Sequence, residues 1–265
     1  MNVTGFRFTA PGTGEVQGDC EMNLGNGCMT DHFQVNSSGY KIFAVLHRPG
    51  ITAFPIVICC HGLLSHKNST KYRTIASALV AHGIGVIRFD FRGCGNSEGE
   101  LHESNVSARL DDLMSIIETV EQIDHFNGKF GLVGSSLGGF ISILAALRTG
   151  KKFPLVTWAT PVSLKPLASR IRKSSILPFI PSDKFIEDLE KYSPEEHLHD
   201  IEQILVLHGS RDELVDPLDA CKIFNGARLP KELHILNDAD HRFTDENARQ
   251  LAVDLTCRWF LKYLF

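Results

Sequence analysis

The segment Gly134-Ser135-Ser136-Leu137-Gly138 has the residue types of a serine nucleophile held in a sharp turn. It lies between an apolar run at 129–133 and a helix-like stretch at 140–148. A strand that enters such a turn and leaves as a helix lifts the serine hydroxyl above the sheet, and glycine is needed on both sides because a Cβ there would clash. The new helix then directs its free N–H groups at whatever bonds to the serine. The pattern predicts acyl-transfer chemistry at Ser136.

The elements that must position Ser136 are those of a repeated β–α fold, because short apolar segments alternate with helix-like stretches. Strands are expected at 32–35, 41–47, 55–60, 86–90, 130–133, 155–159, 204–208 and 232–236. Helices are expected at 70–82, 104–121, 137–148, 218–224 and 245–263. The middle strands are almost continuously apolar, as in a parallel sheet covered on both faces. The chain is therefore predicted to be α/β, with a mostly parallel eight-stranded sheet flanked by helices.

One connection is longer than usual, since about forty residues separate the strands expected at 155–159 and 204–208. The segment at about 161–200 is therefore expected to be a short cap over Ser136. It contains a basic cluster (Lys165, Arg170, Arg172 and Lys173), an apolar stretch broken by proline, and an acidic, helix-like stretch at 183–190. Phe179 and Ile180 in the apolar stretch are expected to bind the substrate. The alternative is an ordinary amphipathic helix pair whose charges are solvated.

Length and composition limit the remaining possibilities. The 265 residues fit one large α/β domain, expected at 31–265, after a glycine-rich extension at 1–30 whose structure the sequence does not predict. A net charge of −4 gives no whole-chain attraction to nucleic acid or to an anionic membrane. Residues 1–10 lack the pattern of a signal peptide, and no segment is long and apolar enough to span a bilayer. The seven cysteines have no metal-ligand spacing, and their odd number favours reduced thiols and a cytoplasmic location.

Five motifs in a fixed order carry a resemblance to a known family. They are His61-Gly62-Leu63, the segment 90–99 (DFRGCGNSEG), the turn around Ser136, the segment 208–212 (HGSRD) and the segment 238–241 (DADH). With these motifs the chain resembles the α/β-hydrolase superfamily from about residue 31 to its end. More narrowly, it is similar to small bacterial serine esterases of the cinnamoyl- and feruloyl-esterase type.

The resemblance implies a role for specific residues. Ser136 would be the nucleophile, Asp212 the acid and His241 the base, in the chain order typical of the family. The backbone N–H groups of Leu63 and Leu137 would form the oxyanion hole. Cys94 stands where relatives often have histidine, and we expect this difference to leave the chemistry unchanged.

Each assignment has a competing interpretation. Among the 12 histidines, His241 stands out because it falls between the last expected strand and the last expected helix. His61 and His208 precede glycine at strand ends and are expected to pack around the site. Arg92 is expected to be a structural clamp. Asp212 directly follows a strand end, and its rivals as the acid are Asp216, Asp238 and Asp240.

These residues predict a serine carboxylesterase that acts on a small-molecule ester through an acyl-enzyme intermediate. Such chemistry needs neither a metal nor an organic cofactor, and none is expected. The same fold and intermediate also serve thioesterases, peptidases and acyltransferases, which stay open as alternatives. A further alternative is a binding protein that keeps the fold without turnover.

Overall fold

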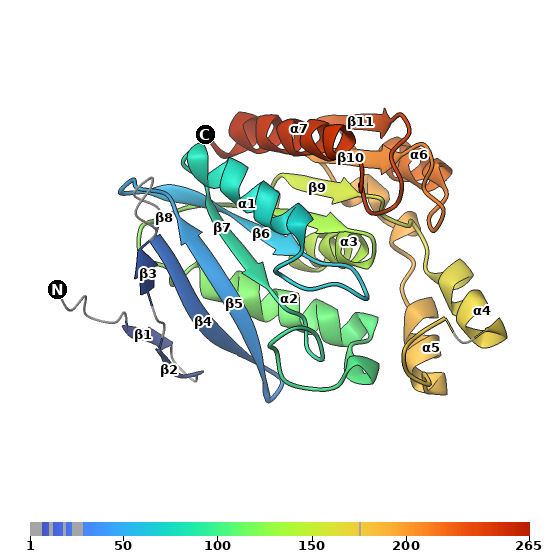
Figure 1. The fold of residues 1–265 in the computed structure, drawn as a ribbon, viewed down its shortest axis with the longest axis horizontal. Helices are drawn as coiled ribbons and strands as arrows, with labels where there is room; N and C mark the ends of the chain where they lie inside the picture. Colours follow the sequence, from blue (N-terminus) through green and yellow to red (C-terminus); the bar gives the residue numbers. More distant parts are fainter. Residues whose placement is uncertain (1–6, 11–12, 18–19, 23–28, 175) are drawn as a thin grey trace.

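The computed structural model describes residues 7–10, 13–17, 20–22, 29–174 and 176–265. Figure 1 shows a twisted central sheet with helices on both of its faces. The strands of this sheet lie in the order β11-β10-β9-β8-β6-β7-β5-β4-β3. Their bounds are β3 (Cys20–Met22), β4 (Met29–Ser37), β5 (Tyr40–Arg48), β6 (Phe54–Cys60), β7 (Gly85–Phe89), β8 (Phe126–Ser135), β9 (Leu155–Trp158), β10 (Ile204–Gly209) and β11 (Lys231–Leu236).

The predicted α/β class and mostly parallel sheet are confirmed. All eight predicted strands are present as β4 to β11, and β6 to β11 pair in parallel with one another. The sheet has nine strands rather than eight, because β3 pairs antiparallel with β4 at the edge. β1 (Arg7–Ala10) and β2 (Thr13–Gln17) form a separate antiparallel pair. Much of the glycine-rich extension at 1–30 lies outside the described residues.

Two layers of helices cover the sheet because its central strands are apolar on both sides. In β6 every residue is buried, and alternate side chains face opposite layers. Ile56 and Ile58 join the cluster that includes α2 and α3, whereas Val57 joins the cluster of α1 and α7. The bounds of these helices, and of α6 beside β10 and β11, are α1 (Thr70–Ala81), α2 (Val106–Val120), α3 (Leu137–Thr149), α6 (Pro217–Gly226) and α7 (Glu246–Leu264).

The connection between β9 and β10 forms a small helical layer at one end of the sheet (Figure 1). It contains α4 (Lys165–Lys173) and α5 (Asp183–Glu190), followed by the short 3₁₀ turns Pro194–Glu196 and Leu198–Asp200. The Ser182 hydroxyl caps α5 by accepting a hydrogen bond from the Phe185 amide, at 3.2 Å. One face of α5, formed by Phe185, Ile186 and Leu189, is buried. The acidic helix predicted at 183–190 is therefore present.

The register of the parallel strands brings the predicted site segments to one edge of the sheet. Cys60 pairs with Gly134, and Ser135 pairs with Trp158, so β6, β8 and β9 end side by side. Gly209 at the end of β10 pairs with Leu236 at the end of β11. The loops that follow these strands therefore share the edge where α/β folds place their ligands. No helix in the described part of the chain has the length and apolar character needed to cross a membrane.

Candidate active site

Ser136 lies at the sharp turn between β8 and α3. Its backbone has the unusual angles φ 56° and ψ −125°, and its amide donates a 2.8 Å hydrogen bond to the Trp158 carbonyl on β9. Glycines flank it because no side chain fits there. A Cβ at Gly138 would lie 2.0 Å from the Cys60 carbonyl oxygen, and one at Gly134 would lie 2.4 Å from the Gly138 oxygen. The turn therefore holds Ser136 in a strained conformation, as nucleophile elbows do.

The structure brings Asp212 and His241 together at the same edge. His241 Nδ1 donates to both carboxylate oxygens of Asp212, at 2.9 Å each. The carboxylate is fully buried and also accepts the backbone amides of Leu214 and Val215, at 2.9 and 2.8 Å. Burial alone would raise the pKa of Asp212, but the hydrogen bonds from His208, His241 and Val215 outweigh it and hold that pKa well below its usual value. Asp212 is therefore an ionised acceptor that fixes the His241 ring.

His208 lies beside the site, where the sequence analysis expects it, but its contact with Asp212 was not predicted. Its Nε2 lies 3.0 Å from Asp212 Oδ2 and 3.1 Å from the Val215 carbonyl oxygen. Because both partners are acceptors, Nε2 carries the proton. His208 Nδ1 is buried without a hydrogen-bond partner among the described residues. His208 was expected only to pack, yet it shares the Asp212 carboxylate with His241.

The rival carboxylates have other partners. Asp216 caps α6 by accepting the Leu218 amide, at 2.9 Å. Asp238 forms an exposed ion pair with Arg211, at 2.6 Å. Asp240 accepts both the amide and the hydroxyl of Thr244, at 2.8 Å each, and so closes the turn after His241. The geometry favours Asp212 as the partner of the histidine.

The remaining link is between Ser136 and His241. Within the described chain, no hydrogen bond joins the Ser136 hydroxyl to His241. Catalytic contacts of this kind are often longer in unliganded structures than in substrate complexes. Gly62 lies against the serine, since a Cβ there would be 3.5 Å from Ser136 Cβ. The predicted oxyanion donors therefore flank Ser136: Leu63 follows Gly62, and Leu137 begins α3.

His61 and Arg92 have the structural contacts predicted for them. The buried His61 accepts the Phe91 amide at Nε2 and donates from Nδ1 to the Gly62 carbonyl, at 3.1 and 2.8 Å. Burial, with the nearby Arg109 charge, lowers the pKa of His61 to about 3, so the ring is neutral. Arg92 donates to the Asp112 carboxylate from Nε and Nη2, at 3.0 and 2.7 Å.

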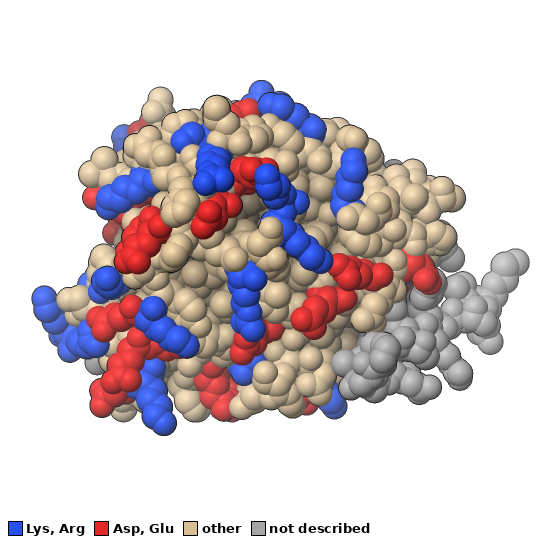
Figure 2. All heavy atoms as spheres, turned by 180° about the vertical axis from the view of Figure 1, so that it is seen from behind, with Lys and Arg blue, Asp and Glu red and all other residues tan. Residues whose placement is uncertain are grey.

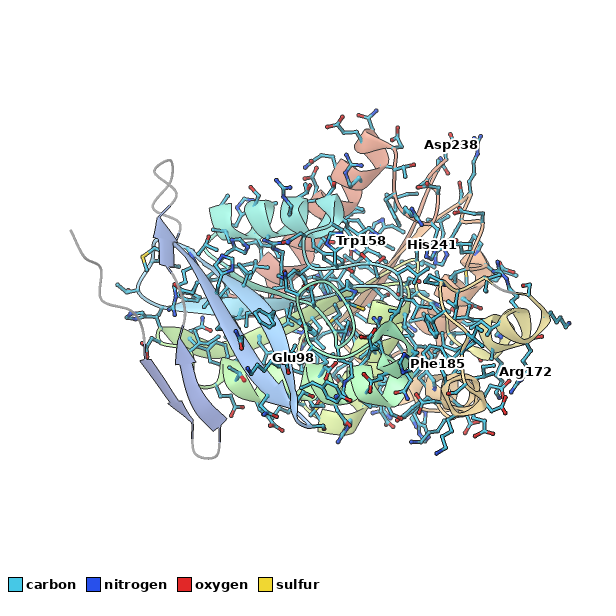
Figure 3. The ribbon with its side chains drawn as sticks, turned by 60° about the horizontal axis from the view of Figure 1, so that its bottom comes forward. Glu98, Trp158, Arg172, Phe185, Asp238 and His241 are labelled. Carbon is cyan, nitrogen blue, oxygen red and sulfur yellow. The ribbon has the colours of Figure 1, made fainter. Side chains whose placement is uncertain are left out.

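Lys71 on α1 is a site residue that the sequence interpretation missed. Its ammonium donates a 2.7 Å hydrogen bond to the hydroxyl of Ser135, the neighbour of Ser136. It also lies 5.4 Å from the Trp158 ring and 5.2 Å from the Phe243 ring, two residues beyond His241. Figure 3 labels Trp158, which comes from β9, and His241, which comes from the loop between β11 and α7. Burial lowers the pKa of Lys71 to about 8, against the attraction of Asp240 and Asp212.

The two predicted cap residues differ in their surroundings. Phe179 is partly buried and packs edge-on against Phe185 of α5, with ring centroids 5.3 Å apart. Ile180 is 96% exposed, and its role in substrate binding stays a prediction.

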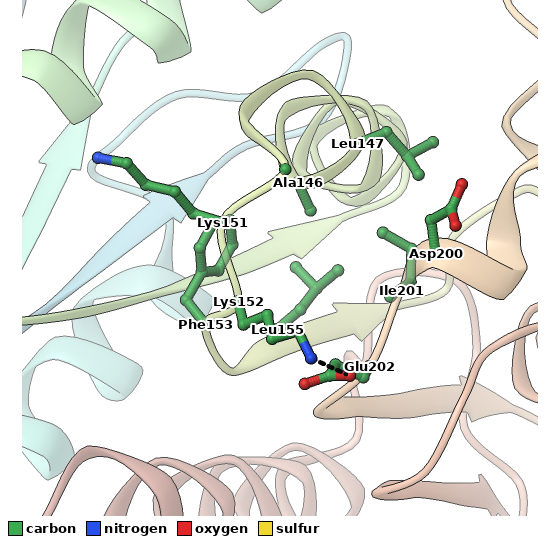
Figure 4. A pocket seen from close by; sticks show the side chains of 10 residues that line it. Ala146, Leu147, Lys151, Lys152, Phe153, Leu155, Asp200, Ile201 and Glu202 are labelled. Carbon is green, nitrogen blue, oxygen red and sulfur yellow. Dashed lines mark hydrogen bonds and ion pairs between the residues drawn. The ribbon is translucent and has the colours of Figure 1, made fainter.

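A small pocket lies at the other end of α3 (Figure 4). Its lining includes Leu147, Phe153 and Ile201, with Lys152 and Glu202 paired across its rim at 3.0 Å. Ser136 precedes the first residue of α3, whereas this pocket surrounds the last turn, about 20 Å away along the helix. The pocket is therefore separate from the Ser136 site. Among the described residues, no group of three or more His, Cys, Asp or Glu side chains could hold a metal ion.

Comparisons with known proteins identify relatives of the chain. Residues 52–181 match the family model described as serine aminopeptidase, S33. The chain is 29% identical over 210 residues to the uncharacterized protein YfhR of Salmonella typhimurium, covering 77% of this chain and 69% of that protein. It is 39% identical over 109 residues to the mitochondrial palmitoyl-protein thioesterase ABHD10 of Bos taurus. That match covers 41% of this chain and only about a third (34%) of the thioesterase.

Solved structures show the same fold. Est1E from Butyrivibrio proteoclasticus, determined with bound ferulic acid, superposes with a TM-score of 0.77 at 18% identity. The alignment covers 86% of this chain and 98% of Est1E. Alpha/beta hydrolase domain-containing protein 10 from mouse superposes with a TM-score of 0.68 at 24% identity, covering 87% of this chain and 98% of that one.

Proposed function

Since this chain belongs to the α/β-hydrolase superfamily, we propose that it is a serine hydrolase that cleaves carboxylic esters through an acyl-enzyme. The observation that carries the proposal is the contact of the buried Asp212 carboxylate with His241 Nδ1, at the sheet edge where the elbow presents Ser136. A carboxylate in this position fixes the imidazole tautomer and leaves Nε2 free to accept a proton.

In the first half-reaction, Ser136 Oγ attacks the ester carbonyl while its proton passes to His241 Nε2. The carbonyl oxygen becomes an oxyanion, which the N–H groups of Leu63 and Leu137 stabilise. The bond from the carbonyl carbon to the alcohol oxygen then breaks. His241 gives its proton to the departing alcohol, and the acyl group stays on Ser136.

In the second half-reaction, water replaces the alcohol. His241 Nε2 accepts a proton from the water as its oxygen attacks the acyl carbon, and the bond to Ser136 Oγ breaks. The proton returns to Ser136 and a carboxylic acid leaves. Asp212 keeps its negative charge throughout and stabilises the imidazolium at each transition state.

Thioester hydrolysis is the second candidate, because a segment covering 41% of this chain is 39% identical to palmitoyl-protein thioesterase ABHD10. Both reactions pass through the same acyl-enzyme and differ in the leaving group. Est1E, whose structure holds ferulic acid, supports the ester alternative through the fold alone. Amide and peptide substrates should also be assayed, because the matching family model is described as a serine aminopeptidase. A cytoplasmic location stays a prediction.

A fluorophosphonate probe and a substrate panel test the proposal. We expect the probe to label wild-type protein on Ser136 and to leave Ser136→Ala unlabelled, with Ser135→Ala as the matched control that keeps labelling. Ester turnover should fall to near background in Ser136→Ala while its thermal unfolding midpoint stays unchanged. Labelling of the Ser136→Ala variant, or its continued turnover, would place the nucleophile elsewhere. No labelling of wild type would support a binding protein instead.

The panel should pair acyl-matched esters, thioesters and amides. An ester preference in kcat/KM supports the carboxylesterase, and a thioester preference supports the second candidate. Faster release of the acyl group to an added alcohol than to water would indicate an acyltransferase.

A further inference from the structure

Arg109 is a fully buried arginine whose guanidinium meets backbone carbonyls rather than an acidic partner. It lies on α2 with no exposed surface. Its Nη1 donates to the Gly62 carbonyl at 3.3 Å and lies 3.5 Å from that of His61, while Nη2 donates to the Leu63 carbonyl at 3.1 Å. The guanidinium also stacks 4.8 Å from the Phe91 ring. One side chain thus contacts the carbonyls of the first three residues of the loop that follows β6.

This contact has a direct stereochemical consequence for the peptide between Gly62 and Leu63. In a trans peptide the C=O and the N–H point in opposite directions. The Gly62 carbonyl is held by Arg109 Nη1 and by His61 Nδ1, at 3.3 and 2.8 Å. The amide on the same peptide is that of Leu63, which must therefore point away from Arg109.

The loop faces Ser136 on its other side. A Cβ on Gly62 would lie 3.5 Å from Ser136 Cβ and 4.0 Å from its hydroxyl oxygen. Gly62 thus separates the buried guanidinium from the nucleophile. Successive amides that point to one side form a concave site for an anion, and an oxyanion needs such donors fixed in advance.

We propose that Arg109 is a positioning residue for catalysis: it fixes the peptide between Gly62 and Leu63 so that the Leu63 N–H faces the oxyanion formed over Ser136. The inference rests on the proposed serine-hydrolase function. Arg109 does not touch the substrate and acts through the loop. Its side chain suits this task because the planar guanidinium presents several donors in a fixed geometry, which a lysine ammonium cannot reproduce.

Arg92 provides a matched control. It is a second buried arginine near α2, 7% exposed, but it donates to the Asp112 carboxylate and the Ser37 hydroxyl. Within the described part of the chain, the hydrogen bonds and ring contact of its side chain involve Asp112, Ser37 and Tyr40, and none of residues 61–63. Arg92→Lys therefore measures how much activity and stability are lost when the hydrogen bonds of a buried arginine are weakened at a site that does not contact residues 61–63.

The experiment compares Arg109→Lys, Arg109→Gln and Arg92→Lys in ester hydrolysis, in inhibition by an alkyl boronic acid and in thermal unfolding. The boronic acid forms a tetrahedral adduct on the serine, so its Ki reports oxyanion binding. The second inhibitor is a non-hydrolysable ketone analogue of the ester, with a methylene in place of the ester oxygen. It is chosen to bind non-covalently, so its Ki reports ground-state binding. We expect Arg109→Lys to lower kcat about 10–100-fold, below the 10²–10³ typical of a lost oxyanion donor, with KM within about twofold. The boronic-acid Ki should rise in parallel, while the ketone Ki stays constant.

Two results would overturn the inference. One is an Arg109→Lys enzyme with wild-type kcat and boronic-acid affinity. The other is a loss that matches Arg92→Lys in every measurement, which would make Arg109 merely structural. If neither Arg109 variant folds, Leu63→Pro decides the question, because proline removes the N–H that Arg109 is proposed to orient: a selective loss of kcat and boronic-acid affinity with an unchanged ketone Ki supports the inference, and their retention overturns it. Wild-type turnover and Ser136 labelling are measured first, so failure of the proposed function is distinguishable from failure of this inference.

Discussion

Asp212 accepts hydrogen bonds from two histidines and two backbone amides, which leaves its carboxylate little freedom to rotate. Two of these donors, the Leu214 and Val215 amides, belong to the same loop after β10 that contains Asp212. The loop thus fixes the carboxylate, and the carboxylate fixes the His241 ring. His208 completes the arrangement because it lies beneath the same carboxylate at the end of β10.

Replacing Asp212 by asparagine should keep the shape of the site and impair its chemistry. An amide at this position favours the wrong tautomer of His241, and in other triads this change costs on the order of 10⁴ in turnover. We expect kcat for an ester to fall by about that factor in Asp212→Asn. Asp238→Asn and Asp240→Asn are the controls, since these carboxylates bind Arg211 and Thr244 instead. A comparable loss in Asp240→Asn would move the acid to that residue.

Lys71 allows a prediction about stability and pH. Its pKa is about 8 in the folded protein, below its ordinary value of 10.5. Between these pH values the unfolded chain binds a proton that the folded protein has released, so Lys71 makes the free energy of unfolding rise with pH by at most about 1.4 kcal/mol per unit. Below pH 8 both states are protonated, and this dependence ends.

The free energy of unfolding in urea is measured for wild type and for Lys71→Met from pH 7 to 10. The difference between the two proteins isolates the titration of Lys71, because all other groups titrate in both. The wild type should gain stability relative to the variant above about pH 8. A constant difference across this range would mean that the ammonium stays charged in the folded protein. Lys71→Arg serves as the control, since arginine does not titrate here.

The sequence could predict the contact between Asp212 and His241 because each follows a strand that ends at the same edge of a parallel sheet. It could not predict the contact of Lys71 with Ser135, since a lysine at the start of a helix usually points into solvent. Arg109 did leave a signal. It falls on the helix face that Val106, Leu110 and Leu113 mark as buried, and a charge on such a face needs a specific partner. The identity of that partner comes only from the packing of α2 against the loop after β6.

At the scale of elements, two kinds of contact hold the segment of α4 and α5, the predicted cap, together. Arg172 on α4 donates to the Glu190 carboxylate on α5, with the Nη2 contact at 2.9 Å. This pair is exposed and contributes little to stability. The apolar contact of Phe179 with Phe185, which continues into the buried face of α5, contributes more.

Phe179→Ala tests whether the cap sets substrate preference. If Phe179 lines the acyl or alcohol pocket, kcat/KM should rise with the apolar chain length of the substrate in wild type, at roughly 0.8 kcal/mol per buried methylene. The variant should flatten that rise and leave acetyl esters nearly unaffected. Ile180→Ala is the matched control, because its side chain is 96% exposed. Equal losses across all chain lengths in Phe179→Ala would indicate a collapsed cap rather than a pocket wall.

Most elements were predictable because their apolar periodicity is strong. β6 and β10 are buried apolar runs, the second half of β8 is buried as well, and α2 and α5 carry clear apolar faces. The helix α4 is predicted only by the alternative of an amphipathic helix pair, since just Ala168 and Ile171 are buried in it. β3 escaped prediction because three residues in a glycine-rich extension carry no periodic pattern. Its place in the sheet depends on pairing with β4, which is a tertiary contact.

At the scale of the whole molecule, charges of both signs are mixed. Figure 2 shows basic and acidic side chains interspersed over the face it presents, and the net charge is only −4. The basic cluster of the cap has acidic neighbours as well. Arg172 is paired with Glu190, and Asp183 and Glu187 on α5 also raise the pKa of Arg172. A field of one sign over the site is therefore weak.

We therefore expect little electrostatic steering of the substrate. For a neutral ester, kcat/KM should change by less than about twofold between ~0.02 and ~0.5 M salt, because screening acts only on charged encounters. An ester with an anionic group should behave similarly if the acidic residues of α5 offset Lys165, Arg170 and Lys173. A several-fold gain for the anionic ester at low salt that disappears in Arg170→Gln/Lys173→Gln would contradict this expectation. The basic cluster would then recruit acidic substrates, and the cap would select by charge as well as by apolar fit.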